Sequence, residues 1–151
     1  MKRILIDSGP LIALFNGNDK YHKASVEFIK NNQYELVTTI ASITETLHLL
    51  DFNTNVQVDF LGWAHSGGLR IEPIVANDLA TIQALTLKYS DLPMDFADAC
   101  LVFLANKLRI DTIATIDRDF DVYRLEGNRC FTVLIKQSKS TYSSNTLSTE
   151  L

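Results

Sequence analysis

Acidic residues in two neighbouring segments have the types and spacing of a metal site. Asp95 and Asp98 lie three positions apart in DFADACLVFLANKL, so on a helix they share one face. Asp117 and Asp119 follow the apolar segment Ile110–Ile116. Carboxylates that converge on one place repel one another unless a cation lies between them, and their oxygens suit Mg²⁺ or Mn²⁺. These segments therefore predict a site for a divalent metal ion.

Two further acids lie where they can join this site. Asp7 ends the short apolar segment Arg3–Ile6, and Glu45 lies on the predicted helix Ile40–Leu50. The strand ends of a parallel sheet share one edge, so acids that are distant in the sequence can meet there. Taken alone, Glu45 is equally well explained as an exposed helix residue.

Most of the other acids also have a simple structural explanation. A turn or cap position explains Asp7, Asp117 and Asp119, and the helix dipole explains Asp95 in a first helical turn. Asp98 is harder to explain in this way, because it lies on a largely apolar helix where an unpaired acid is costly to bury. The group of acids, and no single one of them, indicates the site.

The elements that must position these acids alternate along the chain. We expect strands at Arg3–Ile6, Glu35–Thr39, Leu69–Val75, Ile110–Ile116 and Cys130–Ile135. We expect helices at Leu11–Phe15 after a cap at Ser8, at Lys20–Asn31, Ile40–Leu50 and Val56–His65, from Asn77 or Asp78 to about Tyr89, and from Pro93 to Leu108. This alternation predicts one α/β domain with a parallel sheet covered on both faces. The domain would span residues 1–135, and the Ser- and Thr-rich residues 136–151 would form a disordered tail.

The composition narrows the function further. The 151 residues are 46% hydrophobic and 21% charged, which is ordinary for a globular protein, and the net charge is −4. An acidic protein has no general attraction to nucleic acid, so the charge argues against a plain nucleic-acid-binding module. It does not argue against a metal-dependent nuclease, because the bound ion supplies positive charge locally.

The sequence gives little support for a zinc site, a nucleotide cofactor, a cysteine nucleophile or a membrane location. The three histidines and two cysteines, His22, His48, His65, Cys100 and Cys130, lack metal-ligand spacing, and there is no phosphate-binding glycine loop. Cys100 lies on the apolar helix and should be inert. No apolar run approaches the roughly 20 residues of a membrane span, and the N-terminus lacks the pattern of a signal peptide. We therefore expect a cytoplasmic protein with reduced cysteines.

Taken together, these motifs resemble a PIN domain and, within that superfamily, the VapC-type toxins of prokaryotic toxin–antitoxin pairs. The resemblance rests on ILIDSGPLIALF, on Glu45 in ITETLHLL, on LPMDFADACLVFLANKL and on TIATIDRDF. It covers Met1 to about Ile135, and the spacing between DFADA and ATIDRDF is its most specific part. It implies a three-layer fold with a central parallel sheet of four or five strands flanked by helices.

The resemblance also implies a site and an activity. The family's acidic quartet, which holds Mg²⁺ or Mn²⁺, falls on Asp7, Glu45, Asp98 and Asp117. Asp119 matches a position that assists the metal through water, Ser8 and Thr115 match small hydroxyl positions that support the site, and Asp95 is a further supporting residue. The implied activity is endoribonuclease cleavage that leaves a 5′-phosphate and a 3′-hydroxyl. A protein antitoxin and a homodimer are the implied partners.

Alternatives remain at this point. One is a PIN-fold protein that only binds a partner. Another is a phosphatase or receiver-type domain, although Gly9 occupies the position where such phosphatases carry a second acid and Asp7 has no acidic neighbour. For the homodimer, the residues Phe52, Val56, Phe60 and Trp63 form either an exposed apolar patch or part of the core.

Overall fold

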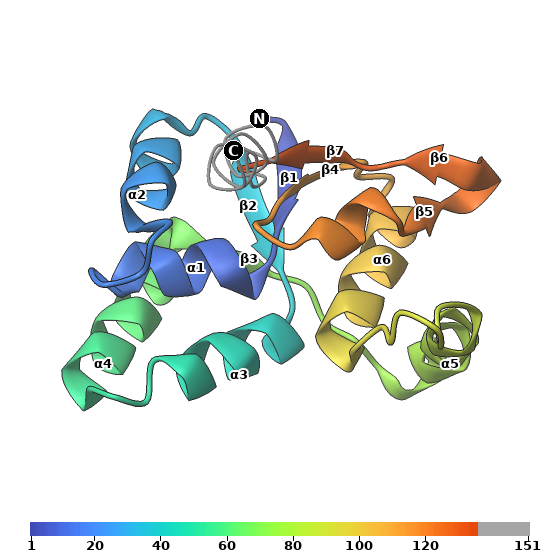
Figure 1. Cartoon of the computed structure of the whole chain (residues 1–151), viewed down its shortest axis with the longest axis horizontal. Coiled ribbons are helices and arrows are strands. Elements are labelled where there is room, and N and C mark those ends of the chain that lie inside the picture. Colours follow the sequence, from blue (N-terminus) through green and yellow to red (C-terminus); the bar gives the residue numbers. More distant parts are fainter. Residues whose placement is uncertain (136–151) are drawn as a thin grey trace, which may run out of the picture.

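A five-stranded parallel sheet runs through the middle of the molecule, with strand order β3-β2-β1-β4-β7 (Figure 1). The structure is a computed structural model that describes residues 1–135, so the predicted tail at 136–151 lies outside the described residues. The strands are β1 (Arg3–Ile6), β2 (Glu35–Thr38), β3 (Arg70–Ile71), β4 (Thr112–Ala114) and β7 (Thr132–Leu134). The predicted parallel sheet is confirmed.

Helices cover the sheet on both sides, which gives the predicted three layers. In Figure 1, α1, α2 and α4 lie to the left of the sheet, and α5 and α6 lie to its right. The helices are α1 (Ser8–Phe15), α2 (His22–Asn31), α3 (Ile40–Leu49), α4 (Thr54–Trp63), α5 (Leu79–Lys88) and α6 (Phe96–Leu108). Short helical turns lie at Ala64–Gly68, Ala76–Asp78, Arg118–Asp121 and Glu126–Asn128.

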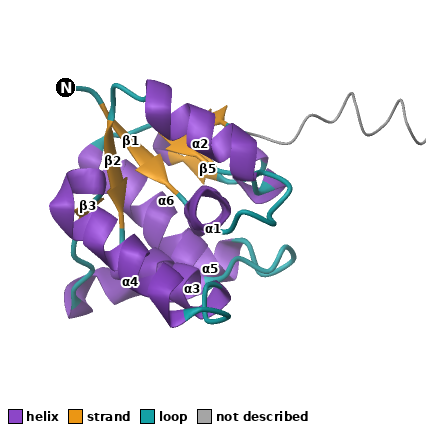
Figure 2. Ribbon diagram, turned by 90° about the vertical axis from the view of Figure 1, so that its left-hand side faces the viewer, coloured by secondary structure: helices purple, strands orange, loops and turns teal. Residues whose placement is uncertain are grey.

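The three central strands, β2, β1 and β4, bury both of their faces, as strands of a covered parallel sheet do. Along β1, Ile4 and Ile6 belong to the apolar cluster that contains Phe60 of α4, whereas Leu5 belongs to the cluster formed mainly by α6. Successive side chains of a strand point to opposite faces, so one short strand contributes to two cores. Figure 2 shows β1 and β2 side by side, as their parallel pairing requires.

Three predicted boundaries need correction, each for a local reason. Pro93 lies in a turn before α6, because Asp95 caps that helix and α6 begins at Phe96. The strand predicted at Leu69–Val75 is only β3, since Pro73 has no N–H to continue the ladder. Helix α2 begins at His22 and not at the predicted Lys20, and in the turn before it the Asp19 carboxylate accepts a hydrogen bond from the Tyr21 N–H.

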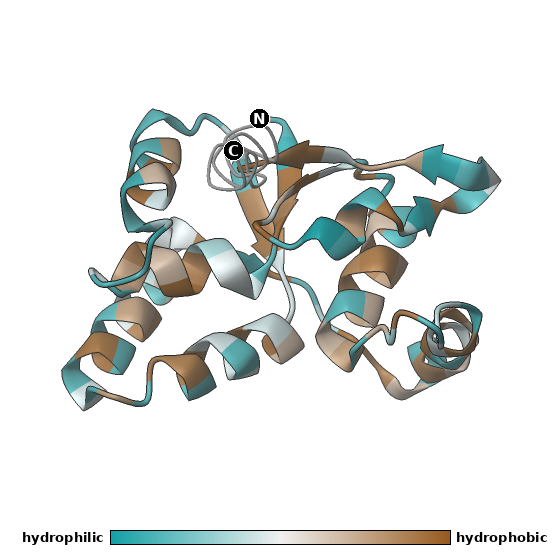
Figure 3. Cartoon of the chain, in the orientation of Figure 1, coloured by the Kyte–Doolittle hydropathy of each residue, from teal (hydrophilic) through white to brown (hydrophobic). Residues whose placement is uncertain are grey.

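The last predicted strand, Cys130–Ile135, is in fact two strands. β6 (Arg129–Cys130) pairs antiparallel with β5 (Arg124–Leu125), and β7 then joins the main sheet beside β4. Phe131 lies between β6 and β7 and is buried in the α6 core. In Figure 3 the outer end of the β5–β6 hairpin is hydrophilic, whereas β1 inside the sheet is mainly hydrophobic.

Candidate metal site at the carboxyl edge of the sheet

Asp7 lies at the carboxyl end of β1 and is held from two sides. Its Oδ1 accepts a hydrogen bond from the Ser8 N–H at 2.8 Å, which caps α1, and its Oδ2 accepts one from the Thr115 hydroxyl at 2.9 Å. Only 4% of Asp7 is exposed. Asp7 therefore caps α1, whereas the sequence analysis placed the cap at Ser8. The Ser8 hydroxyl donates a hydrogen bond to Glu45 of α3.

Asp117 follows β4, the neighbouring strand, and is the exposed member of the group. Its N–H donates to the Thr115 hydroxyl oxygen at 2.9 Å, so Thr115 connects the backbone of Asp117 to the carboxylate of Asp7. Asp117 Oδ1 accepts the Asp119 N–H at 2.9 Å and caps the short helix Arg118–Asp121. The capping role considered from the sequence is thus real, and Asp117 also lies beside the other acids.

Asp98 enters the same place from the first turn of α6. Its N–H donates to Asp95 Oδ1 at 2.8 Å, because Asp95 is the N-cap of this helix. Asp98 Oδ2 accepts a hydrogen bond from the Tyr123 hydroxyl at 2.9 Å. Only 5% of Asp98 is exposed, so this acid is buried and not solvated.

Three of the four acids of the predicted quartet come together. Asp7, Asp98 and Asp117 each offer a carboxylate oxygen, and these oxygens all lie within 4.8 Å of one another; no other such group occurs in residues 1–135. Glu45 is outside this group, but it is bonded to Ser8, the neighbour of Asp7. At the edge of the site, Asp95 caps α6 by accepting the Asp98 N–H, and the Asp119 N–H donates to the Asp117 carboxylate.

Burial and charge crowding raise the pKa values of the two buried acids. The pKa of Asp7 is about 7, mainly because of burial, and the charges of Glu45 and Asp117 also raise it, against the hydrogen bonds from Ser8 and Thr115. Ionising this acid in the metal-free protein is therefore costly.

The pKa of Asp98 is about 8, mainly because of burial and then because of the charges of Asp7 and Asp95. The hydrogen bond from Tyr123 opposes this rise. Burial also raises the pKa of Asp119, and the charge of Asp117 adds to that effect. Carboxyl groups are thus concentrated where burial and their mutual repulsion oppose ionisation.

These residues fit a divalent metal ion. The donor atoms are all carboxylate oxygens, which hard cations such as Mg²⁺ and Mn²⁺ prefer, and soft sulfur ligands are absent from the group. A cation would also offset the burial and the repulsion that together raise the pKa values of Asp7 and Asp98. Asp117 is the exposed aspartate of the three, so the group can be reached from solution.

Sequence reasoning missed Tyr123, which directly contacts Asp98. The side chain is fully buried, and burial together with the charge of Asp98 raises the pKa of its hydroxyl, so that the group acts as a hydrogen-bond donor. A tyrosine six residues after Asp117 carries no local pattern that predicts its partner. Only the packing of this segment against α6 brings the two side chains together.

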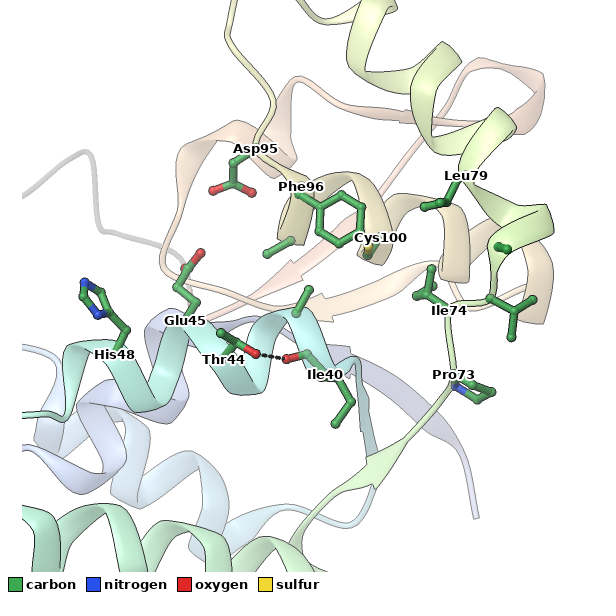
Figure 4. A pocket seen from close by; sticks show the side chains of 14 residues that line it. Ile40, Thr44, Glu45, His48, Pro73, Ile74, Leu79, Asp95, Phe96 and Cys100 are labelled. Atoms are coloured by element: carbon green, nitrogen blue, oxygen red, sulfur yellow. Dashed lines mark hydrogen bonds between the residues drawn. The ribbon is translucent and has the colours of Figure 1, made fainter.

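A mainly apolar groove of about 930 Å³ adjoins the site between α3, α6 and the segment before α5 (Figure 4). Glu45 and Asp95 line one end of it, and the exposed side chains of Ile40 and Phe96 line its walls. Cys100 is buried at the groove, and burial raises the pKa of its thiol to about 11, as expected for an inert cysteine.

No helix within residues 1–135 is long and apolar enough to cross a membrane.

Comparison with known proteins gives consistent results. The model of the PIN domain family matches residues 4–125. Ribonuclease VapC26 of Mycobacterium tuberculosis is 28% identical over 134 residues, covering 87% of this chain and 99% of that protein. The crystal structure of Mycobacterium tuberculosis VapC20, described as a toxin that cleaves the Sarcin-Ricin loop, has the same fold with a TM-score of 0.72 at 20% identity. That match covers 79% of this chain and 93% of the VapC20 chain.

Proposed function

The chain belongs to the PIN domain family, and we propose that it is a metal-dependent endoribonuclease that hydrolyses RNA phosphodiester bonds. The observation that carries this proposal is the convergence of the Asp7, Asp98 and Asp117 carboxylates at one edge of the sheet. VapC26, which aligns along nearly its whole length, is named a ribonuclease. The net charge of −4 is compatible with an RNA substrate only if positive charge is supplied locally, as a metal site does.

The three aspartates would hold Mg²⁺ or Mn²⁺. Such an ion lowers the pKa of a bound water and neutralises charge on a phosphate during in-line attack. The chain's own residues keep the ligands in place. Ser8 and Thr115 fix both oxygens of Asp7, whereas Tyr123 fixes one oxygen of Asp98.

Glu45 and Asp119 act at the edge of the site rather than as members of the three-carboxylate group. Glu45 is anchored by the Ser8 hydroxyl, and Asp119 lies next to the Asp117 side chain that its N–H contacts. Mg²⁺ typically keeps several waters, so acids at this distance can contact the ion through water. Asp95 supports the site by capping α6.

We further propose that this ribonuclease is the toxin of a type II toxin–antitoxin pair and that it acts in the cytoplasm with a protein antitoxin as its partner. The support is the likeness to two proteins named VapC, one of them described as a toxin. The test is to find a small neighbouring gene whose product binds this chain and inhibits its cleavage of RNA. A chain that cuts RNA but has no such neighbour would be a ribonuclease without the toxin role.

The homodimer stays a prediction, and the surface suggested for it needs correction. Phe60 is fully buried in the core, and Val56 and Trp63 pack against the same core, so only Phe52 of the four residues is a largely exposed side chain, at 58%. Phe15, Phe60 and Trp63 form an aromatic cluster inside the molecule. Three of the four residues therefore pack in or against the core, as the alternative interpretation held, and Phe52 is the exposed one.

The function is tested with purified protein, total RNA and either Mg²⁺ or Mn²⁺, with a chelator as the metal-free control. We expect cleavage by the wild type and a loss of at least about 100-fold in Asp98→Asn, because most of the stabilisation of the reacting phosphate depends on the metal. Asp51→Asn is the matched control, since it makes the same charge change at an exposed position after α3. Metal binding without cleavage of any RNA would favour the partner-binding protein instead.

A further inference from the structure

The hydroxyl of Tyr123 is a buried donor whose acceptor is one of the three clustered carboxylates. It donates to Asp98 Oδ2 at 2.9 Å, and the tyrosine is fully buried. Most buried tyrosine hydroxyls find some partner, so the bond alone is ordinary. The partner is not ordinary, because Asp98 is itself only 5% exposed and lies within the group of three aspartates.

The ring that carries this hydroxyl is held firmly. It packs edge to face against Phe120 with centroids 5.1 Å apart, and against Tyr89 at the same distance. The Tyr123 N–H donates to the Asp119 carbonyl at 3.0 Å, and the hydroxyl of Tyr89 accepts the N–H of Arg124 at 2.8 Å. Both the ring and the backbone of Tyr123 are therefore fixed before any ligand arrives.

The bond also joins two parts of the chain that carry different ligands. Asp98 lies on α6, whereas Asp117 and Tyr123 lie on the connection that follows β4. Because the hydroxyl of Tyr123 reaches across to Asp98, it couples the position of α6 to the segment that presents Asp117. Within residues 1–135, Tyr123 supplies the side-chain hydrogen bond to the Asp98 carboxylate. The Thr115 hydroxyl supplies the corresponding bond to the Asp7 carboxylate.

We propose that Tyr123 is a positioning residue for the metal site: its hydroxyl holds one oxygen of Asp98 and leaves the other oxygen oriented for a divalent cation. This inference rests on the proposed metal-dependent activity and adds a residue to it. Groups that hydrogen-bond to metal ligands orient them, and loss of one such group typically costs about 10- to 100-fold in metal affinity or activity. Tyr123 is not a catalytic residue, because it contacts the ligand and not the reacting atoms.

The test compares Tyr123→Phe with Tyr89→Phe. Both variants lose one hydroxyl within the same aromatic cluster and keep the ring, but only Tyr123 contacts an aspartate of the site. Calorimetric titration with Mn²⁺ in the absence of RNA measures metal affinity directly, and kcat and KM are measured separately. We expect Tyr123→Phe to weaken Mn²⁺ binding by about tenfold or more and to lower kcat with little change in KM, whereas Tyr89→Phe should bind Mn²⁺ like the wild type.

The outcomes separate positioning from general packing. Equal Mn²⁺ affinities for Tyr123→Phe, Tyr89→Phe and a metal-binding wild type would overturn the inference and leave the proposed function intact. A Tyr123→Phe protein that fails to fold would assign the hydroxyl to the fold and would also overturn it. A wild type that binds no Mn²⁺ would instead remove the proposed function, and this inference with it.

Discussion

Asp7 at the end of β1 lies close to Asp98 in the first turn of α6, and its charge adds to the effect of burial, which is the main cause of the raised pKa of Asp98. Both side chains are buried, and their pKa values are about 7 and about 8. Without a metal ion, the folded protein therefore retains protons on this pair near neutral pH. The measurable properties of the site follow from this competition between protons, burial and a cation.

Metal-free stability should fall as the pH rises. An aspartate in the unfolded chain has a pKa of about 3.9, so the folded protein binds protons more tightly than the unfolded chain does. The stability from these protons is fully present below about pH 4 and is lost as the pH rises to about 8. Thermal melts with a chelator should show Asp98→Asn more stable than the wild type by at least ~1 kcal/mol near pH 8, with the difference vanishing at low pH. If the free energies of unfolding of the two proteins changed with pH in the same way, ionisation of Asp98 would not destabilise the folded protein.

Mn²⁺ affinity should rise with pH over the same range. The metal needs deprotonated carboxylates, so it competes with the protons held by Asp7 and Asp98. Calorimetric titration should give binding about tenfold tighter or more at pH 8 than at pH 6. An affinity that does not depend on pH would place the ion away from these two acids.

Thr115 should matter through its hydroxyl alone. It is fully buried, donates to Asp7 Oδ2 and accepts the N–H of Asp117. Thr115→Val leaves both partners without that bond, so we expect a loss of about 1–3 kcal/mol in the free energy of unfolding and about 10- to 100-fold weaker Mn²⁺ binding. Thr115→Ser restores the hydroxyl and should recover most of the metal affinity; a serine variant as weak as the valine variant would count against this role.

Glu45→Gln should differ from Asp98→Asn in the size of its effect. Glu45 is bonded to Ser8 and lies outside the three-carboxylate group. We expect Glu45→Gln to retain most of the Mn²⁺-induced rise in melting temperature, while RNA cleavage falls by about tenfold or more because charge near the ion changes. If Glu45→Gln abolishes the Mn²⁺-induced rise as Asp98→Asn does, Glu45 is a direct ligand.

The resemblance to the PIN domain family placed the acidic quartet on Asp7, Glu45, Asp98 and Asp117, and local rules explain why three of these positions can share one site. Two of them end strands of one parallel sheet, and the third lies in a first helical turn that a cap fixes. The parallel sheet followed in the same way from buried apolar strands that alternate with helices.

Tyr123 and Phe60 could not be placed in this way. Whether a tyrosine reaches an aspartate, or a phenylalanine on an amphipathic helix faces the core or the solvent, depends on how whole elements pack. The edge position of Glu45 is of the same kind, because a shift of one helix relative to a strand decides whether it enters the carboxylate group. Such distances are tertiary properties, and no local pattern encodes them.

The central claim is that Asp7, Asp98 and Asp117 bind a divalent metal ion, and one measurement tests it most directly. The melting temperatures of wild type, Asp98→Asn and the control Asp51→Asn are compared with and without Mn²⁺ at about pH 8, where Asp7 is mostly deprotonated and protons compete only weakly with the ion for Asp98. We predict that Mn²⁺ raises the melting temperature of the wild type and of Asp51→Asn by several degrees, because it binds only the native state, and that Asp98→Asn gains little or nothing. Equal rises in wild type and Asp98→Asn, or none in the wild type, would contradict the claim.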